Sequence, residues 1–265
     1  MTADDASPQL SWTQDNEPRS GRFGDVYFSK DDGLAETQTV FLQGCDLPNA
    51  WREAGQFTVA ELGFGTGLNI VALLDLWRRT RPDDAHLHIF SIEAFPLTAE
   101  EAGRALAAWP ELNDIVQPLL DAWPDRTPGF HRIDLSDFNA TIDLAVGDVV
   151  WALDQWTGQA DAWFLDGFSP ALNPQMWSDP VLDLIAARSA PLARVGTFTV
   201  AGAVRRGLAA RGFAVDKRPG HGRKRERLEA RLAPNPAPVG PGDTKTPRHA
   251  TLRIAVVGAG VAGAS

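Results

Sequence analysis

The chain has 265 residues, of which 44% are hydrophobic, enough to bury the core of one large domain or two small ones. Its single cysteine, Cys45, excludes an intrachain disulfide and favours a reducing compartment. The acidic N-terminus, MTADDASPQL, lacks the basic and apolar regions of a signal peptide, and no apolar run is long enough to span a bilayer. We therefore expect a soluble cytoplasmic protein without a membrane partner.

The charge is strongly polarised along the chain. The net charge is −9, but residues 204–231 hold ten Lys and Arg against three Asp and Glu, a local charge of +7, whereas residues 1–203 carry −18. Such a basic segment can hold a phosphate backbone while the acidic remainder repels non-specific binding. A solvated basic helix face is the alternative interpretation, and both stay open at this point.

The predicted elements alternate between strands and helices, which is typical of a mostly parallel sheet with helices on both faces. Residues 1–50 lack clear periodicity and are interpreted as short strands and turns that cover one edge of the core. The segment GFHRIDLSDFNATIDLAVGD predicts a hairpin around SDFNA. Strands are expected at 57–62, 87–92, 141–146, 161–165 and 196–201, and helices at 68–79, 98–108, 149–156, 178–189 and 203–211.

The first glycine motif, within FTVAELGFGTGLNIVALLDLW, follows the first of these strands. A P-loop needs Lys and Ser/Thr after its last glycine, and the dinucleotide fingerprint needs its third glycine one residue later than Gly67, so neither pattern fits. The E-x-G-x-G-x-G spacing instead resembles motif I of class I S-adenosylmethionine-dependent methyltransferases. A plain tight turn is the alternative. The cofactor residues expected here are Glu61, near the methionyl ammonium group, with Gly63, Gly65, Gly67 and Asn69.

Two further acidic residues stand at predicted strand ends. Glu93, in IFSIEAF, can accept hydrogen bonds from both ribose hydroxyls, and Asp148, in VGDVVWAL, from the adenine amino group. Either residue could instead cap a helix. Because the carboxyl ends of parallel strands form the ligand crevice of open α/β sheets, the three features together favour a cofactor site.

Asp166, in WFLDGFSPALNPQMW, ends the fourth strand. Methyl transfer needs an acceptor with a free lone pair, and an alkylamine is mostly protonated at neutral pH. A carboxylate beside the methyl group would orient the amine and take its proton, so Asp166 is the candidate general base. Phe168 could form an apolar wall that stacks on a base. An ordinary Asp-Gly turn is the alternative.

Taken together, GRFGDVYFSKDDGLAETQTVFLQG, ELGFGTGLN, SIEAFP, FLDGFSPALNPQMW and GHGRKRE resemble the methyltransferase half of the bifunctional tRNA 5-methylaminomethyl-2-thiouridine biosynthesis family, over about residues 8–231. The resemblance implies methylation of the primary amine of 5-aminomethyl-2-thiouridine at the tRNA wobble position, with Asp166 as the base. It also implies tRNA as partner, S-adenosylmethionine as cofactor and no metal. The expected tRNA-facing residues are Arg223, Lys224, Arg225 and Arg227.

The resemblance also accounts for a second glycine motif, in LRIAVVGAGVAGAS. Residues 1–231 are expected to form the methyltransferase domain, and the proline-rich residues 232–250 a semi-rigid linker. Residues 251–265 would then be the first strand and turn of the family's FAD-dependent oxidoreductase domain, with Gly258, Gly260 and Gly263 in its fingerprint. One strand and a turn cannot supply a whole FAD site.

Two other functions remain to be weighed. Aminopropyltransferases of the spermidine synthase type share the fold, but their polyamine substrates call for several acidic pocket residues. A non-catalytic tRNA-binding module would keep GHGRKRER without needing the acidic set.

Overall fold

The structure is a computed structural model that describes residues 7–14, 17–28, 33–222 and 225–234. One compact unit ends at Pro234. Of the predicted linker only its first three residues are described, and the second glycine motif lies outside the described residues. Both therefore stay predictions.

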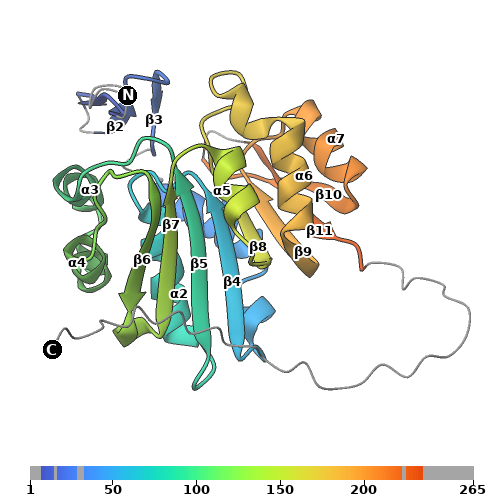
Figure 1. Cartoon of the computed structure of the whole chain (residues 1–265), viewed down its shortest axis with the longest axis horizontal. Coiled ribbons are helices and arrows are strands. Elements are labelled where there is room, and N and C mark those ends of the chain that lie inside the picture. Colours follow the sequence, from blue (N-terminus) through green and yellow to red (C-terminus); the bar gives the residue numbers. More distant parts are fainter. Residues whose placement is uncertain (1–6, 15–16, 29–32, 223–224, 235–265) are drawn as a thin grey trace, which may run out of the picture. The chain divides into compact units, whose positions relative to one another are not determined.

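An eight-stranded sheet forms the centre of the unit, in the order β10-β11-β9-β8-β4-β5-β7-β6 (Figure 1). The five strands from β9 to β7 are parallel. The antiparallel β10–β11 hairpin extends the sheet beyond β9, and β6 pairs antiparallel with β7 at the other edge. The strands are β4 (Gln56–Leu62), β5 (His86–Glu93), β6 (Gly129–Leu135), β7 (Ala140–Val146), β8 (Ala160–Leu165), β9 (Ser189–Thr197), β10 (Phe213–Pro219) and β11 (Glu226–Leu232).

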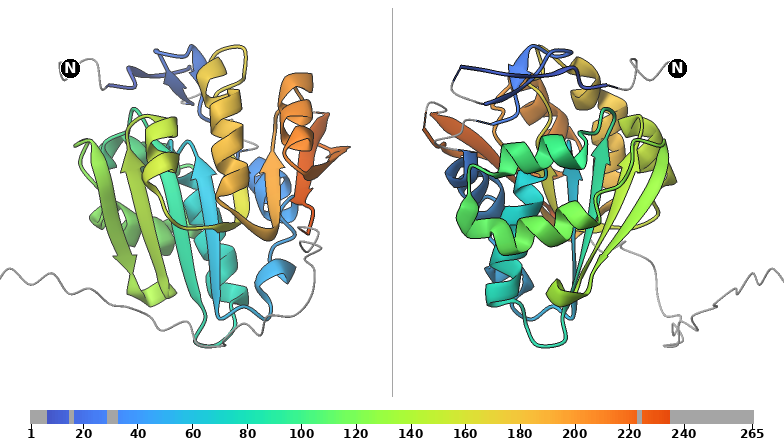
Figure 2. Two further views of the ribbon diagram at one scale, coloured as in Figure 1. Left: turned by 45° about the vertical axis from the view of Figure 1, so that its right-hand side comes forward. Right: turned by 90° about the vertical axis from the view of Figure 1, so that its left-hand side faces the viewer.

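Helices cover both faces of the sheet, as Figure 2 shows from two sides. The inner strands are apolar on both faces, as parallel strands between two helical layers must be. In β8, for example, Phe164 belongs to one buried cluster and the neighbouring Trp163 to the other. The first cluster includes α2 (Leu68–Thr80), α3 (Ala99–Leu106) and α4 (Asn113–Asp121), and the second α5 (Val149–Gln155), α6 (Asp179–Ala187) and α7 (Gly202–Ala210). Among the described residues, no helix is long and apolar enough to cross a membrane.

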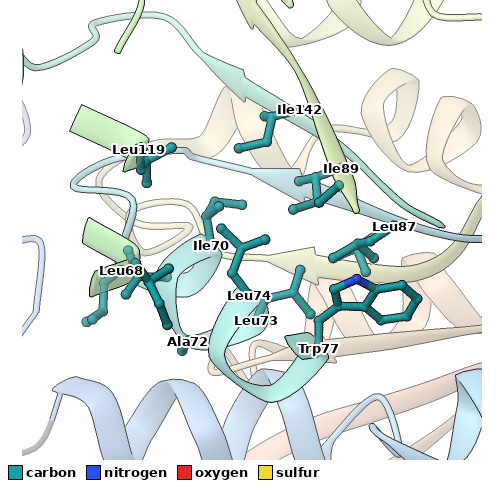
Figure 3. Packing of buried hydrophobic residues seen from close by; sticks show 14 of the residues in the cluster. Leu68, Ile70, Ala72, Leu73, Leu74, Trp77, Leu87, Ile89, Leu119 and Ile142 are labelled. Atoms are coloured by element: carbon teal, nitrogen blue, oxygen red, sulfur yellow. The ribbon is translucent and has the colours of Figure 1, made fainter. Parts of the chain in front are cut away.

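Helix α2 fixes the position of the first glycine motif. It contains no internal Gly or Pro and begins directly after Gly67, whose φ of 79° few other residues adopt. Figure 3 shows its buried side chains, among them Leu74 and Trp77, against Leu87 and Ile89 of β5. Each such buried side chain contributes about 1.5 to 3 kcal/mol. The start of α2 is therefore held firmly at the end of β4.

Most of the predicted elements are confirmed. Four of the five predicted strands begin within one residue of β4, β5, β7 and β8, and all five predicted helices exist. The hairpin around SDFNA is the β6–β7 pair, turned by a 3-10 segment (Ser136–Phe138) and by Asn139 at φ 52°. The fold is of the expected α/β class, a mostly parallel sheet with helices on both faces.

The fifth predicted strand, 196–201, is wrong. The actual strand β9 runs from Ser189 to Thr197, and Phe198 has already left the sheet. Its sequence, SAPLARVGT, contains Pro, Arg and Gly, and Leu192 has a positive φ of 68° beside an irregularity in the pairing with β8. The pairing partners β8 and β11 stabilise a strand that its own composition does not predict.

The interpretation of residues 1–50 is only partly right. Three short strands are present: β1 (Leu10–Trp12), β2 (Pro18–Ser20) and β3 (Asp25–Val26). However, α1 (Gly33–Thr37) continues into a π-helical segment (Gln38–Gln43) that buries Val40, Phe41 and Leu42. The hydrophobic residues of a π-helix do not recur with the 3.6-residue period of an α-helix, so the sequence pattern does not predict this segment. The helix α4 and the strands β10 and β11 are likewise absent from the predicted elements.

The basic segment 204–231 is not one helix. It comprises α7 and the β10–β11 hairpin, so the interpretation as a solvated basic helix face is wrong for most of its length. In the hairpin several cations pair with neighbouring carboxylates. Lys217 Nζ lies 2.8 Å from Glu226, and Arg218 lies 3.3 Å from Asp216.

Candidate active site

The sheet has one switch point, at β4. The chain proceeds from β4 to β5 and β7 on one side, and β8 and β9 follow on the other side. Open α/β sheets bind ligands in the crevice at such a point, outside the carboxyl ends of the strands. A cavity of about 1390 Å³ lies there. Among the residues that line it are Gly63, Gly65, Glu93, Asp148, Asp166 and Phe168.

The glycine loop packs directly against the end of β8. Its three glycines have φ values of 91°, 53° and 79°, which side-chain-bearing residues rarely adopt. A Cβ atom on Gly63 would lie 2.2 Å from the carbonyl oxygen of Asp166. The Asp166 N–H donates to the Leu62 carbonyl at 3.1 Å. The glycine loop and the candidate base are thus adjacent. This close backbone packing by itself requires glycine at position 63, with or without a bound ligand.

Glu61 and Asn69 form a buried polar network below the loop. Asn69 Nδ2 donates to Glu61 Oε1 at 3.0 Å and to Asp166 Oδ2 at 2.6 Å. Ser91 Oγ donates to Glu61 Oε2 at 2.6 Å, and Thr37 Oγ1 donates to Asn69 Oδ1 at 2.8 Å. Burial raises the pKa of Glu61 to about 8, so this carboxyl is mostly neutral at pH 7. Glu61 is fully buried and does not line the cavity.

Glu93 and Asp148 lie at the ends of β5 and β7 and both line the cavity. Glu93 accepts from the backbone N–H groups of Gly65, at 3.0 Å, and Phe95, at 2.8 Å. Burial raises the pKa of Glu93. Asp148 caps α5, because its Oδ1 accepts from the N–H groups of Val150 and Trp151. Capping and ligand binding are compatible here, since both cap bonds use one of the two carboxylate oxygens.

Phe168 belongs to an aromatic group that the sequence does not reveal. Its ring stacks on Phe23, with centroids 4.6 Å apart, and meets Tyr27 edge-on at 5.4 Å. Phe23 also contacts Phe95 at 5.9 Å, and the Arg22 guanidinium lies 4.1 Å from the centre of the Phe95 ring. All five residues line the cavity. The N-terminal segment therefore contributes to the site as well as packing on the core.

The basic residues predicted to face tRNA lie in and beside the loop between β10 and β11. Arg223 and Lys224 fall outside the described residues. Arg225 is exposed at the end of this loop, close in sequence to His221 and Gly222, which line the cavity. Arg227 is half-buried and already paired with Glu229 at 2.6 Å. A phosphate contact by Arg227 would have to compete with that ion pair.

Across the described ranges, no group of His, Cys, Asp and Glu has an arrangement that could hold a metal ion.

Comparisons with known proteins agree with this geometry. A family model described as S-adenosyl-L-methionine-dependent methyltransferase matches residues 110–233. The tRNA 5-methylaminomethyl-2-thiouridine biosynthesis bifunctional protein MnmC of Caulobacter sp. is 60% identical over 270 residues, which covers 100% of this chain and 43% of that protein. The protein of the same name from Caulobacter vibrioides is 61% identical over 265 residues, with the same coverage.

A solved structure extends the comparison to the fold. The crystal structure of MNMC2 from Aquifex aeolicus matches with a TM-score of 0.65 and 26% identity, covering 85% of this chain and 70% of that chain. The chain spans less than half the length of the curated relatives that it matches. The chain belongs to the S-adenosylmethionine-dependent methyltransferases and, among them, to the family formed by the methyltransferase half of these bifunctional proteins.

Proposed function

We propose that the chain transfers a methyl group from S-adenosylmethionine to the primary amine of 5-aminomethyl-2-thiouridine at the tRNA wobble position. The observation that carries the proposal is one cavity lined by the glycine loop, by Glu93 and by Asp166. The names of the relatives at 60% and 61% identity support the choice of substrate.

The residues around the cavity fit S-adenosylmethionine. The ribose presents two hydroxyl donors and the adenine one amino donor, and the acceptors Glu93 and Asp148 end neighbouring strands. Glu93 is fixed by two backbone N–H groups, so its carboxylate is preorganised. Gly63 and Gly65 line the cavity together with Asp166, and the methionyl part would lie beside them. When bound, the cofactor supplies an electrophilic methyl group on a sulfonium.

The chemistry left to the protein is the removal of a proton. An alkylammonium ion has a pKa of about 10, so the acceptor amine reaches the site mostly protonated. Asp166 would take a proton from the nitrogen and leave a lone pair directed at the methyl carbon. The neutral form of Glu61 removes a like charge from beside Asp166. The backbone contact to Leu62 holds Asp166 at the end of β8.

The aromatic group supports a nucleobase as the carrier of the amine. Enzymes that modify a base extrude it and hold it against aromatic or apolar side chains. Phe168 and Phe23 present such surfaces on the Asp166 side of the cavity, and sequence-specific RNA recognition commonly uses the same stacking. Arg225 and the two residues before it would contact the tRNA backbone.

The aminopropyltransferase alternative receives one supporting observation. The cavity also contains acidic residues from the N-terminal region, Glu17, Asp25 and Glu36, as a polyamine site would require. An aminomethyl group is itself a cation, so these carboxylates suit both substrates. The relatives are named for tRNA modification, which favours the nucleoside.

We further propose that the chain acts in the cytoplasm. In the longer relatives a fused FAD-dependent oxidoreductase domain would occupy the part that this chain does not match. FAD would belong to that domain.

The test is label transfer. Undermodified tRNA that carries the aminomethyl group should accept a labelled methyl group from S-adenosylmethionine, and tRNA that already carries the methylaminomethyl group should not. In a parallel reaction, decarboxylated S-adenosylmethionine and putrescine should give no spermidine. Spermidine formation without tRNA labelling would establish the alternative.

A further inference from the structure

We infer that Asn69 is a positioning residue that holds Asp166 in place and does not itself bind the cofactor. The inference deepens the proposed function, because it rests on Asp166 as the general base. It also changes the role expected for Asn69, which the sequence places in the cofactor loop.

The first argument is that the polar atoms of Asn69 are already used. Its amide nitrogen has two hydrogens, and these go to Glu61 Oε1 at 3.0 Å and to Asp166 Oδ2 at 2.6 Å. Its carbonyl oxygen accepts from Thr37 at 2.8 Å. The side chain is 6% exposed. A cofactor acceptor could bind the Asn69 amide nitrogen only if one of its two buried bonds were given up, which is costly.

The second argument is that Asn69, although it lines the cavity, is anchored by partners on two other elements, β4 and α1. Its partner Glu61 lies on β4 and accepts in turn from Ser91 on β5, while Thr37 ends α1. The backbone of Asn69 belongs to the first turn of α2, whose packing fixes it against the sheet. A side chain held by these bonds has one geometry, so the Nδ2–H group directed at Asp166 is fixed as well.

The third argument concerns what this bond does. A hydrogen bond from an amide N–H favours the ionised form of a carboxyl group and fixes which of its oxygens is engaged. Asp166 Oδ2 receives the Asn69 bond, so the rotation of the carboxylate is restrained. Asn69 would therefore raise the fraction of Asp166 that can act as a base and orient it at the same time.

The experiment compares Asn69→Ala with the wild-type chain without any substrate. Carbon-13 NMR of the labelled Asp side chains, with the Asp166 signal assigned by its disappearance in Asp166→Asn, gives the titration midpoint of this carboxyl group. Removal of the Asn69 bond should move the midpoint to higher pH by about one unit, the scale of one hydrogen bond to a charged group. A folded Asn69→Ala chain with an unchanged midpoint would overturn the inference.

Turnover and binding separate positioning from cofactor contact. In Asn69→Ala, kcat should fall roughly tenfold and its acidic limb should move to higher pH, while the Kd of S-adenosylmethionine stays within about twofold. A Kd that weakens as much as kcat falls would make Asn69 a cofactor ligand and reject the inference. Asn113→Ala, at an exposed position of α4 outside the cavity, is the matched control.

Thr37→Val provides a milder test if Asn69→Ala does not fold. It removes only the bond to Asn69 Oδ1, so the Asp166 midpoint should move in the same direction by a smaller amount. An unchanged midpoint in this variant would also contradict the inference. If both midpoints shift but no tRNA is methylated by the wild-type chain, the proposed function fails while the coupling between Asn69 and Asp166 stands.

Discussion

The two sides of the cavity are built differently. On the cofactor side, Gly65 and Glu93 lie at the ends of the packed strands β4 and β5, and the Gly65 N–H donates to the Glu93 carboxylate at 3.0 Å. On the acceptor side, Phe23 and Phe168 come from a turn and a loop that belong to no strand or helix.

The rigid side binds the cofactor, a function that many proteins of one fold share, whereas the loop side selects the substrate. A rigid scaffold with loops around its rim lets one fold bind one cofactor and accept many substrates. Asp166 stands at the boundary, because it directly follows β8 and lines the same cavity as Phe23 and Phe168. Changes on the cofactor side should therefore alter cofactor affinity, changes on the acceptor side should alter tRNA use, and changes at Asp166 should alter turnover.

The largest effect is expected at this boundary. Asp166→Asn should lower kcat by roughly 100-fold or more, the usual scale for removal of a general base, while the affinity for S-adenosylmethionine changes little. Raising the pH should partly rescue the variant, because more of the amine is then free. Measurement of kcat at several pH values would determine both the loss and the rescue, and Asp137→Asn, at an exposed position, is the control. Near-normal turnover of Asp166→Asn at pH 7 would reduce Asp166 to a turn residue.

On the cofactor side, Glu93→Ala should weaken S-adenosylmethionine binding by roughly 10-fold to 100-fold, since it removes bonds between a charged acceptor and two hydroxyls. Calorimetry measures the Kd directly, and Glu111→Ala, at an exposed position, serves as control. Unchanged affinity, or binding of NADH in place of S-adenosylmethionine, would contradict the assignment of this side.

On the acceptor side, Phe168→Ala and Phe23→Ala should each raise the KM for tRNA roughly tenfold, since stacking on a base contributes about 1 to 3 kcal/mol. The Kd for S-adenosylmethionine should not change. Phe130→Ala is a matched control, because Phe130 is an exposed aromatic residue outside the cavity lining. If the Phe168 variant bound the cofactor more weakly instead, the division into two sides would be wrong.

A smaller effect is expected at the β10–β11 loop. Charge reversal at Arg223 and Arg225 should weaken tRNA binding and reduce the slope of log K against log salt by somewhat under 1 for each phosphate group that the variant no longer binds. Arg227→Ala should do less, because Arg227 is paired with Glu229. Arg52→Glu, exposed before the start of β4, is the control. Equal salt slopes for the wild type and the double variant would show that this loop does not contact tRNA.

The last prediction concerns the stability of the cofactor side. Because burial raises the pKa of Glu61 to about 8, the folded chain keeps this proton while the unfolded chain releases it near the ordinary Glu value. The stability that Glu61 contributes is thus complete below that ordinary value and declines as pH rises toward 8, by at most about 1.4 kcal/mol per pH unit. Glu61→Gln should flatten this dependence in thermal unfolding. Identical slopes in both proteins would show that Glu61 is ionised in the folded state.

The sequence locates Gly63, Glu93 and Asp166, which line one cavity, because its signals there are local. The spacing of Gly63, Gly65 and Gly67 is visible within five residues, and the ends of apolar runs locate Glu93 and Asp166. The rule that parallel strands end at one edge then brings these residues together. The same reasoning gives most of the sheet and its helices.

The acceptor side could not be predicted in this way. Phe23 meets Phe168 only through the tertiary fold, and no periodicity marks the turn that carries it. The role of Asn69 is hidden for the same reason, since Asp166 is far from it along the chain. The strand β9 is misplaced by the sequence pattern because its pairing partners, and not its composition, keep it extended.

The most direct test of the account is to identify the methylated nucleoside. Undermodified tRNA is incubated with the chain and labelled S-adenosylmethionine, digested and analysed by mass spectrometry, with Asp166→Asn in parallel. The account predicts that the label appears in 5-methylaminomethyl-2-thiouridine, at the aminomethyl nitrogen, and is nearly absent with the variant. Label in another nucleoside, or equal labelling by the variant, would contradict it.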